Sequence, residues 1–312
     1  MPAIRQSGIT RSHANSHRDQ QGAKRQIVPA VTGKLKTNAY PELERDLSFY
    51  PLGVKEPNVL TREQIDQYNR DGYLAPLTIF SSKEMTNVRH YFDDLLERGM
   101  TKGWTNYDLT NWHKYCRGVW DLVTQDRILD IVSDLLGDTV ILRHSHFFAK
   151  LPGDGKKVSW HQDASYWPLS KSRVVSAWLA IDDVDESNSP MHVIPGSHKR
   201  AQLAFADSWP PEENVLNQVV EDALTYGDPV PLILKAGEIS LHSDWILHGS
   251  EKNTSNRRRC GLAMRFLSGD VRAYLGWNQH SIVCRGTDPT AHWAHHPRPD
   301  GEDIPELDAI TK

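Results

Sequence analysis

The chain has 312 residues, of which 38% are hydrophobic and 24% are charged. This composition supplies enough apolar side chains for a sizeable core and excludes a wholly disordered protein. The net charge of −4 gives no general support for nucleic-acid binding, and no apolar run approaches the ~20 residues of a membrane-spanning helix. Three cysteines without a Cys-x-x-Cys pair argue against a disulfide framework and a thiolate zinc site, so we expect a cytoplasmic compartment.

The first 36 residues differ in composition from the rest of the chain. They contain seven Lys and Arg but one acidic residue, Asp19, and they lack the apolar core of a signal peptide. This composition predicts a flexible basic arm, which we place at residues 1–45. A mitochondrial transit peptide is the alternative, because such peptides are also rich in Arg and poor in acids.

Helical patterns dominate the next part of the chain. Capping boxes at Thr61 and Ser81 predict two helices, which end near Gly72 and Gly99. A third amphipathic stretch stops at Gly137.

Beyond these helices the pattern changes to short strands separated by Gly and Pro turns. Helices followed by many strands, without βαβ alternation, predict an α+β domain with a mainly β core of antiparallel strands in a sandwich or barrel. We expect an insertion with a helical piece around residues 205–228 and an irregular tail from about residue 270. The predicted strands cover residues 73–80, 139–151, 158–163, 174–181, 191–194, 230–235, 238–242 and 259–267.

The segment Trp160-His-Gln-Asp163 is the strongest local signal for chemistry. Residues i and i+2 of a strand face the same side, so His161 and Asp163 are expected to point into one space. A His and a carboxylate are two members of a facial triad, which leaves other positions of a metal open. His248, on another strand, is the candidate third ligand. The pair alone is weak evidence, because solvated His and Asp side chains are common on surfaces.

Arg259 follows His248 by eleven positions and begins an apolar strand. An Arg on an inward-facing strand is costly unless it meets an anion. Its planar guanidinium suits a carboxylate, so a dicarboxylate co-substrate is the expected partner. A structural ion pair is the alternative, and Arg265, on the same strand face, is the second candidate.

Three further segments accompany these residues, namely 178–182, 193–198 and 247–250. Together the pattern resembles the phytanoyl-CoA dioxygenase family of Fe(II)/2-oxoglutarate-dependent oxygenases over about residues 60–268. The resemblance implies a double-stranded β-helix, or jelly roll of cupin-like form, flanked by N-terminal helices. We therefore expect a single jelly-roll oxygenase domain over residues 46–312.

The resemblance also implies the cofactors and the reaction. Fe(II) would be bound by the protein, with 2-oxoglutarate and O2 as co-substrates. Oxidative decarboxylation to succinate and CO2 would accompany hydroxylation of a substrate C–H bond. The residues implied for the metal are His161, Asp163 and His248, and those implied for 2-oxoglutarate are Arg259, Trp178, Ser250 and Ser176.

The substrate is expected to be a small organic metabolite, because no cluster of Lys and Arg indicates a nucleotide. We expect neither nucleic acid nor a membrane as a partner, and the oligomeric state stays open. For the histidines core packing is as good an explanation as substrate contact, and for the aromatic residues sealing of the barrel mouth is as good an explanation as a wall of the substrate pocket. These candidates are His146, His144, Tyr166, Trp167 and Trp245.

The same candidate residues are compatible with other reactions and other classes of protein. The same iron chemistry can end in desaturation, epoxidation or ring formation, depending on where the substrate lies. A jelly-roll protein that binds metal without turnover would be expected to lack part of the triad or Arg259. A zinc hydrolase with the same ligands would not need Arg259.

Overall fold

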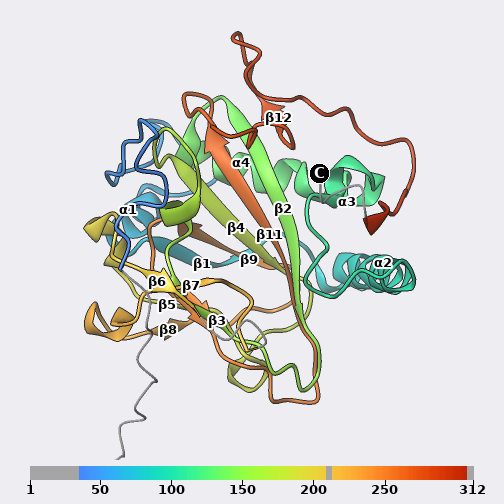
Figure 1. Cartoon of the computed structure of the whole chain (residues 1–312). Coiled ribbons are helices and arrows are strands. Elements are labelled where there is room, and N and C mark those ends of the chain that lie inside the picture. Colours follow the sequence, from blue (N-terminus) through green and yellow to red (C-terminus); the bar gives the residue numbers. More distant parts are fainter. Residues whose placement is uncertain (1–34, 209–212, 308–312) are drawn as a thin grey trace, which may run out of the picture. The chain divides into compact units, whose positions relative to one another are not determined.

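The computed structural model describes residues 35–208 and 213–307 (Figure 1). Most of the predicted basic arm, residues 1–34, therefore lies outside the described residues, and the domain boundary at residue 45 stays a prediction. Within the described ranges, no helix has the length and apolar character needed to cross a membrane.

Four α-helices lie in the first part of the described chain, and strand β1 (Tyr73–Thr78) separates the first helix from the second. Helices α1 (Arg62–Asp71) and α2 (Ser82–Thr101) begin at the predicted capping boxes, where the Thr61 and Ser81 side chains accept backbone N–H groups. Helix α4 (Asp126–Leu136) ends at Gly137, as predicted. Helix α3 (Arg117–Val123) was not predicted, because seven residues without a side-chain cap carry too little periodic signal.

The larger sheet has six strands in the order β1-β9-β4-β11-β2-β12, and all neighbouring strands are antiparallel. Strand β12 lies in the tail that was expected to be irregular, so that expectation is wrong at this point. The strands are β1 (Tyr73–Thr78), β2 (Val140–Lys150), β4 (Val174–Ala180), β9 (Glu238–Ser243), β11 (Arg259–Ser268) and β12 (Ile282–Arg285).

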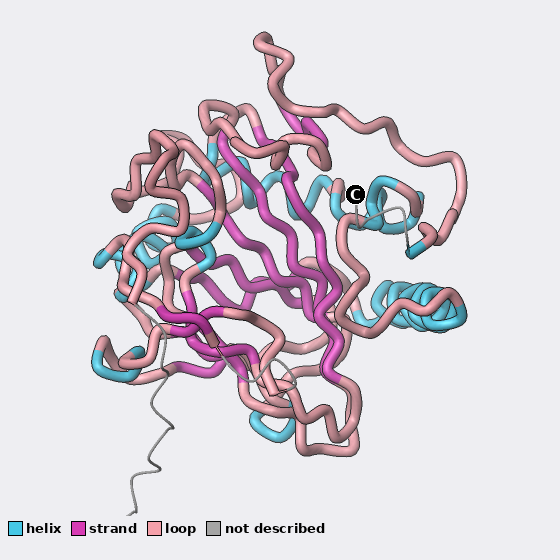
Figure 2. Tube along the Cα trace, viewed as in Figure 1, coloured by secondary structure: helices cyan, strands magenta, loops and turns pink. Residues whose placement is uncertain are grey.

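The second sheet has four strands in the order β3-β10-β5-β8, and a pair, β6-β7, lies in the predicted insertion. All four strands of the second sheet differ from the prediction, because β3, β5 and β8 are shorter than predicted and β10 was not among the predicted strand ranges. Figure 2 shows that loops connect these short strands. The strands are β3 (Val158–His161), β10 (His248–Ser250), β5 (His192–Val193), β8 (Val230–Pro231), β6 (Ala206–Asp207) and β7 (Gln218–Val219). Short 3-10 helices cover Trp112–Lys114, Asp163–Tyr166, Glu186–Asn188, Ser197–Arg200 and Ala223–Thr225.

The two faces of the larger sheet have different roles. In β11, Leu262, Met264 and Phe266 belong to the apolar core that α1 to α4 share with the sheet. The alternate residues Ala263 and Arg265 line a cavity on the opposite face, toward β3 and β10. Helices α2, α3 and α4 lie along one side of this sheet and the short strands lie on the other (Figure 1). This arrangement is a jelly roll flanked by helices, and it confirms the predicted fold class.

Candidate metal centre and co-substrate pocket

Strand pairing brings the two candidate histidine ligands together. His248 in β10 lies directly opposite His161 in β3, and the centroids of their imidazole rings are 4.0 Å apart. Directly opposed residues of an antiparallel pair place their side chains side by side on one face of the sheet. Two residues that are 87 positions apart in the sequence thereby become neighbours.

Asp163 reaches the same place by a different route from the one predicted. Strand β3 ends at His161, and Asp163 is the first residue of a 3-10 helix. The prediction that both residues lie on one strand is therefore wrong, because the chain turns here and the N–H of Ala164 donates to the carbonyl of Asp244. The carboxylate still points at the histidine, with 3.5 Å between His161 Nε2 and Asp163 Oδ1.

The three side chains form a donor set that suits a divalent metal ion. One ligand atom of each lies within 4.8 Å of the others, and all three residues are buried. His161 Nδ1 donates to the carbonyl of Ser159 at 2.8 Å and His248 Nδ1 to that of Ile246 at 3.0 Å. Because a carbonyl only accepts, these bonds place the imidazole proton on Nδ1 and leave Nε2 free to bind a metal. Two nitrogens and one carboxylate are a ligand set that fits Fe(II) with open positions.

Neighbouring groups hold the Asp163 carboxylate in its charged form. Burial alone would raise its pKa, but the adjacent His161 imidazole and the positive charge of Arg265 keep the pKa well below the ordinary value. Tyr166 Oη donates to Asp163 Oδ1 at 3.1 Å, and Ser176 Oγ donates to Oδ2 at 3.4 Å. These contacts orient the carboxylate and favour its ionised form.

Arg259 lies at the other end of the same cavity and is 3% exposed. Its Nε donates to the carbonyl of Ser189 at 3.1 Å, and its Nη2 donates to Ser250 Oγ at 3.3 Å. The guanidinium carbon lies 5.7 Å from the centroid of the Trp178 ring. Burial lowers the pKa of Arg259 to about 10, so the group stays cationic at neutral pH. A buried cation without a carboxylate partner in the described chain is a ready site for an anion.

Lys150, which sequence reasoning missed, is a second buried basic side chain beside this pocket. It lies directly opposite Arg259 in the pairing of β2 with β11. Its Nζ donates to Ser250 Oγ at 2.8 Å and to the carbonyls of Ser250 and Glu251. Burial, together with the charge of Arg259, lowers the pKa of Lys150 to about 6. The position of a Lys at the end of a largely apolar strand was the sequence signal that could have identified Lys150 as a pocket residue.

Ser250 gains a defined role from these contacts. Its Oγ accepts hydrogen bonds from both Lys150 and Arg259. Because both lone pairs of Oγ then accept hydrogen bonds, only the hydroxyl hydrogen is left, and it is free to donate into the cavity. Ser176, by contrast, lies beside Asp163 and not beside Arg259.

Four of the five candidate substrate residues line a larger, outer cavity next to this one. His144 Nε2 bonds Thr110 Oγ1 at 2.7 Å, and His146 Nε2 bonds the carbonyl of Tyr107 at 2.8 Å. Burial lowers the pKa of His146 to about 4, and that of His144 falls as well. Both imidazoles are therefore neutral at physiological pH. The four residues in this cavity are His144, His146, Tyr166 and Trp167.

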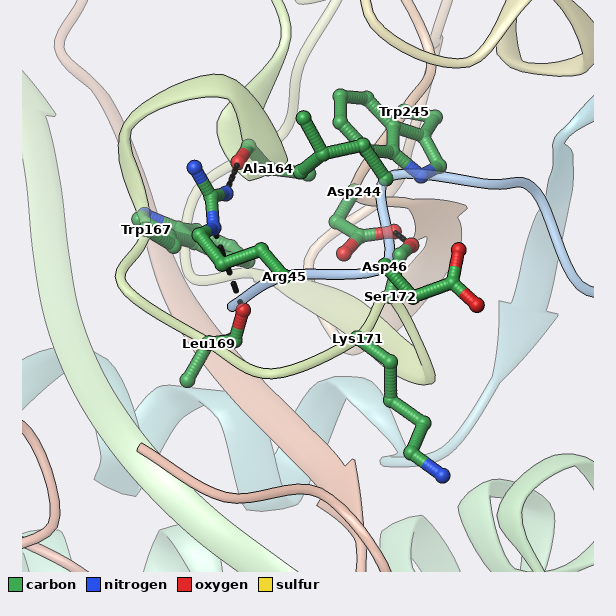
Figure 3. A pocket seen from close by; sticks show the side chains of 10 residues that line it. Arg45, Asp46, Ala164, Trp167, Leu169, Lys171, Ser172, Asp244 and Trp245 are labelled. Atoms are coloured by element: carbon green, nitrogen blue, oxygen red, sulfur yellow. Dashed lines mark hydrogen bonds between the residues drawn. The ribbon is translucent and has the colours of Figure 1, made fainter. Parts of the chain in front are cut away.

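The structure does not bring Trp245 to either cavity. Trp245 is fully buried and lines a separate small pocket with Asp244 and Arg45 (Figure 3). Arg45 donates there to the carbonyls of Ala164 and Leu169. These two hydrogen bonds connect the segment before α1 to the segment that follows Asp163. The connection between β9 and β10 carries Trp245 away from the candidate metal ligands, and the path of this connection could not be predicted from the sequence.

Comparisons with known proteins agree with this geometry. Residues 68–261 match the family model described as phytanoyl-CoA dioxygenase (PhyH). The chain is 25% identical over 266 residues to the peroxisomal phytanoyl-CoA dioxygenase of Bos taurus, covering 77% of each chain. It is 29% identical to a probable alpha-ketoglutarate-dependent hypophosphite dioxygenase of Stutzerimonas stutzeri, covering 53% of this chain and 58% of the relative.

A solved structure shares the fold. EctD from S. alaskensis, with 2-oxoglutarate and 5-hydroxyectoine, superposes with a TM-score of 0.63 at 18% identity, covering 88% of this chain and 99% of EctD. The family model covers more than half of the chain and includes His161, Asp163, His248 and Arg259. The chain therefore belongs to the phytanoyl-CoA dioxygenase family of 2-oxoglutarate-dependent dioxygenases.

Proposed function

We propose that this enzyme uses Fe(II), 2-oxoglutarate and O2 to hydroxylate a C–H bond of a small organic molecule. One observation carries the proposal: a buried His-Asp-His cluster and the buried guanidinium of Arg259 line a single cavity between the two sheets. A co-substrate such as 2-oxoglutarate binds a metal at one end and carries a carboxylate at the other. It therefore requires a set of metal ligands and an anion site in the same cavity.

The residues of the chain divide the work. His161, Asp163 and His248 would hold the metal, and Arg259 and Ser250 would hold the distal carboxylate of 2-oxoglutarate. When bound, the iron supplies the redox chemistry that couples O2 reduction to decarboxylation of 2-oxoglutarate, yielding succinate and CO2. Desaturation, epoxidation or ring formation would use the same residues and differ in the position of the substrate.

The first test is spectroscopic and needs no knowledge of the substrate. Adding Fe(II) and then 2-oxoglutarate without oxygen should produce the weak visible charge-transfer band of the chelate. The band should be lost in His248→Ala, because one nitrogen ligand is gone, and kept in His90→Ala, whose imidazole is exposed on α2. Tight iron binding without a band in the wild type would contradict the proposed co-substrate pocket.

Gly261 offers a test of the pocket wall formed by Trp178. A Cβ atom at Gly261 would lie 2.0 Å from Trp178 Cζ2, so Gly261→Ala must displace the indole. Overpacking of this kind costs ~1–3 kcal/mol of folding stability. The displaced indole also changes the shape of the co-substrate pocket, and a loss of about 1.4 kcal/mol in binding would raise the KM for 2-oxoglutarate roughly 10-fold. Gly155→Ala is the matched control, because nothing lies within 4 Å of its added Cβ. Equal KM values for the two variants would show that Trp178 does not shape the pocket.

A further inference from the structure

The outer cavity adjoins the inner cavity that contains the candidate metal ligands. It shares Phe148, Tyr166, Leu216 and Arg265 with the inner cavity that holds the metal ligands. Arg259 lines the inner cavity and is absent from the lining of the outer one. The chemistry of the outer cavity therefore bears on the substrate and not on the distal end of 2-oxoglutarate.

A strand irregularity turns Arg143 toward this cavity. Along the pairing of β11 with β2, Arg265 lies opposite His144, but the next residue, Phe266, lies opposite Leu142. Arg143 is thus the extra residue of a β-bulge, and a bulge redirects the side chain it contains. Arg143 and His144 consequently both line the outer cavity, although adjacent strand residues ordinarily face opposite sides.

Arg143 has no carboxylate partner in the described chain. Its guanidinium stacks on Trp277 with 3.5 Å from the central carbon to the ring centroid, and its Nε donates to the Trp277 carbonyl at 3.4 Å. No ion pair involves it among the described residues. Burial and the nearby charge of Arg265 lower its pKa to about 9. Two guanidinium groups are therefore close enough to repel each other.

Arg265 is only partly neutralised. Its Nη2 lies 3.9 Å from Asp163 Oδ2, which is a long ion pair, and its buried Nη1 has no hydrogen-bond partner within the described ranges. The one carboxylate in the lining of the outer cavity, Asp108, accepts hydrogen bonds from Thr105. Lys156 adds a third cation to the lining. The cavity thus has an excess of positive charge and free N–H donors.

We propose that the substrate is an organic acid whose carboxylate binds between Arg143 and Arg265. The proposal rests on the proposed function, since it names the substrate class for that same site. A carboxylate accepts the free guanidinium donors and removes the repulsion between the two cations. Phe148, Trp167 and Trp277 line the same cavity and provide an apolar surface for the rest of the molecule.

The test compares acids with their amides, which have the same shape but no charge. A panel of aryl and alkyl carboxylic acids, each with its primary amide, is added to the anaerobic protein loaded with Fe(II) and 2-oxoglutarate, and binding is followed by the change in the charge-transfer band. Binders are then assayed for stimulated succinate formation in air. We expect acids to bind and their amides to fail.

Arg143→Met should weaken binding of the acids about 10- to 100-fold, the effect of losing one charge-assisted hydrogen bond. The band itself should persist, because Arg143 does not line the inner cavity. Arg143→Lys should restore part of the affinity, and Arg200→Met, at an exposed site, should behave like the wild type. A panel in which no acid binds better than its amide, or unchanged affinity in Arg143→Met, would overturn the proposal. Absence of the band in the wild type would instead contradict the proposed function.

Discussion

Replacing Asp163 by alanine should abolish the formation of succinate from 2-oxoglutarate, with a loss of at least about 100-fold. Mutations of groups that merely orient a metal ligand cost 10–100-fold, so removal of a ligand should cost more. The loss has a second cause in this chain. Arg265 and Tyr166 both point at the carboxylate, and without it the buried guanidinium loses its one nearby anion. Metal titration and succinate assays, run on the same preparation, measure the two effects.

The matched control is Asp66→Ala, which removes an exposed carboxylate from α1 and should leave both measurements unchanged. Circular dichroism of each variant separates loss of the site from loss of the fold. Succinate formation at the wild-type rate in Asp163→Ala would show that the triad is assigned to the wrong residues.

The sequence predicted the elements of this site because the relevant signals are local. The spacing of His161 and Asp163 holds both side chains in one cavity even though the backbone between them leaves the strand. The apolar run after Arg259 correctly predicted a long central strand with alternating faces. Gly72 and Gly137 ended the helices where expected, since both adopt positive φ.

Non-local geometry set the limit of these predictions. The pairing register places Lys150 opposite Arg259, although the two residues are 109 positions apart. Neither segment contains a sequence pattern that predicts this pairing. The bulge at Arg143 reverses the face of one side chain without any Gly or Pro to announce it. Strict alternation would have assigned Arg143 to the helix-covered face. The sequence could therefore suggest the metal site but not the cationic outer cavity.

Arg259→Met should raise the KM for 2-oxoglutarate about 100-fold, with a smaller change in kcat. The guanidinium would hold a carboxylate that is remote from the reacting atoms, so its loss weakens binding more than chemistry. A bidentate charged pair contributes two hydrogen bonds of ~1.5–3 kcal/mol each, which covers a change of this size. The measurement is succinate formation against 2-oxoglutarate concentration. Arg259→Lys keeps the charge but loses the planar fork, and it should give an intermediate KM.

Lys150 affects how large the rise in KM should be in Arg259→Met. In Arg259→Met it is the remaining buried basic group at the pocket, and the charge of Arg259 that helped to lower the pKa of Lys150 is gone. A bound carboxylate would favour its protonated form, so Lys150 should supply part of the residual affinity. The double variant Lys150→Met/Arg259→Met should therefore bind 2-oxoglutarate more weakly than Arg259→Met. If Arg259→Met leaves the dependence on 2-oxoglutarate unchanged, the distal carboxylate does not bind there. Arg265, on the same strand face, would then take over that role, and Arg265→Met would have to show the rise in KM.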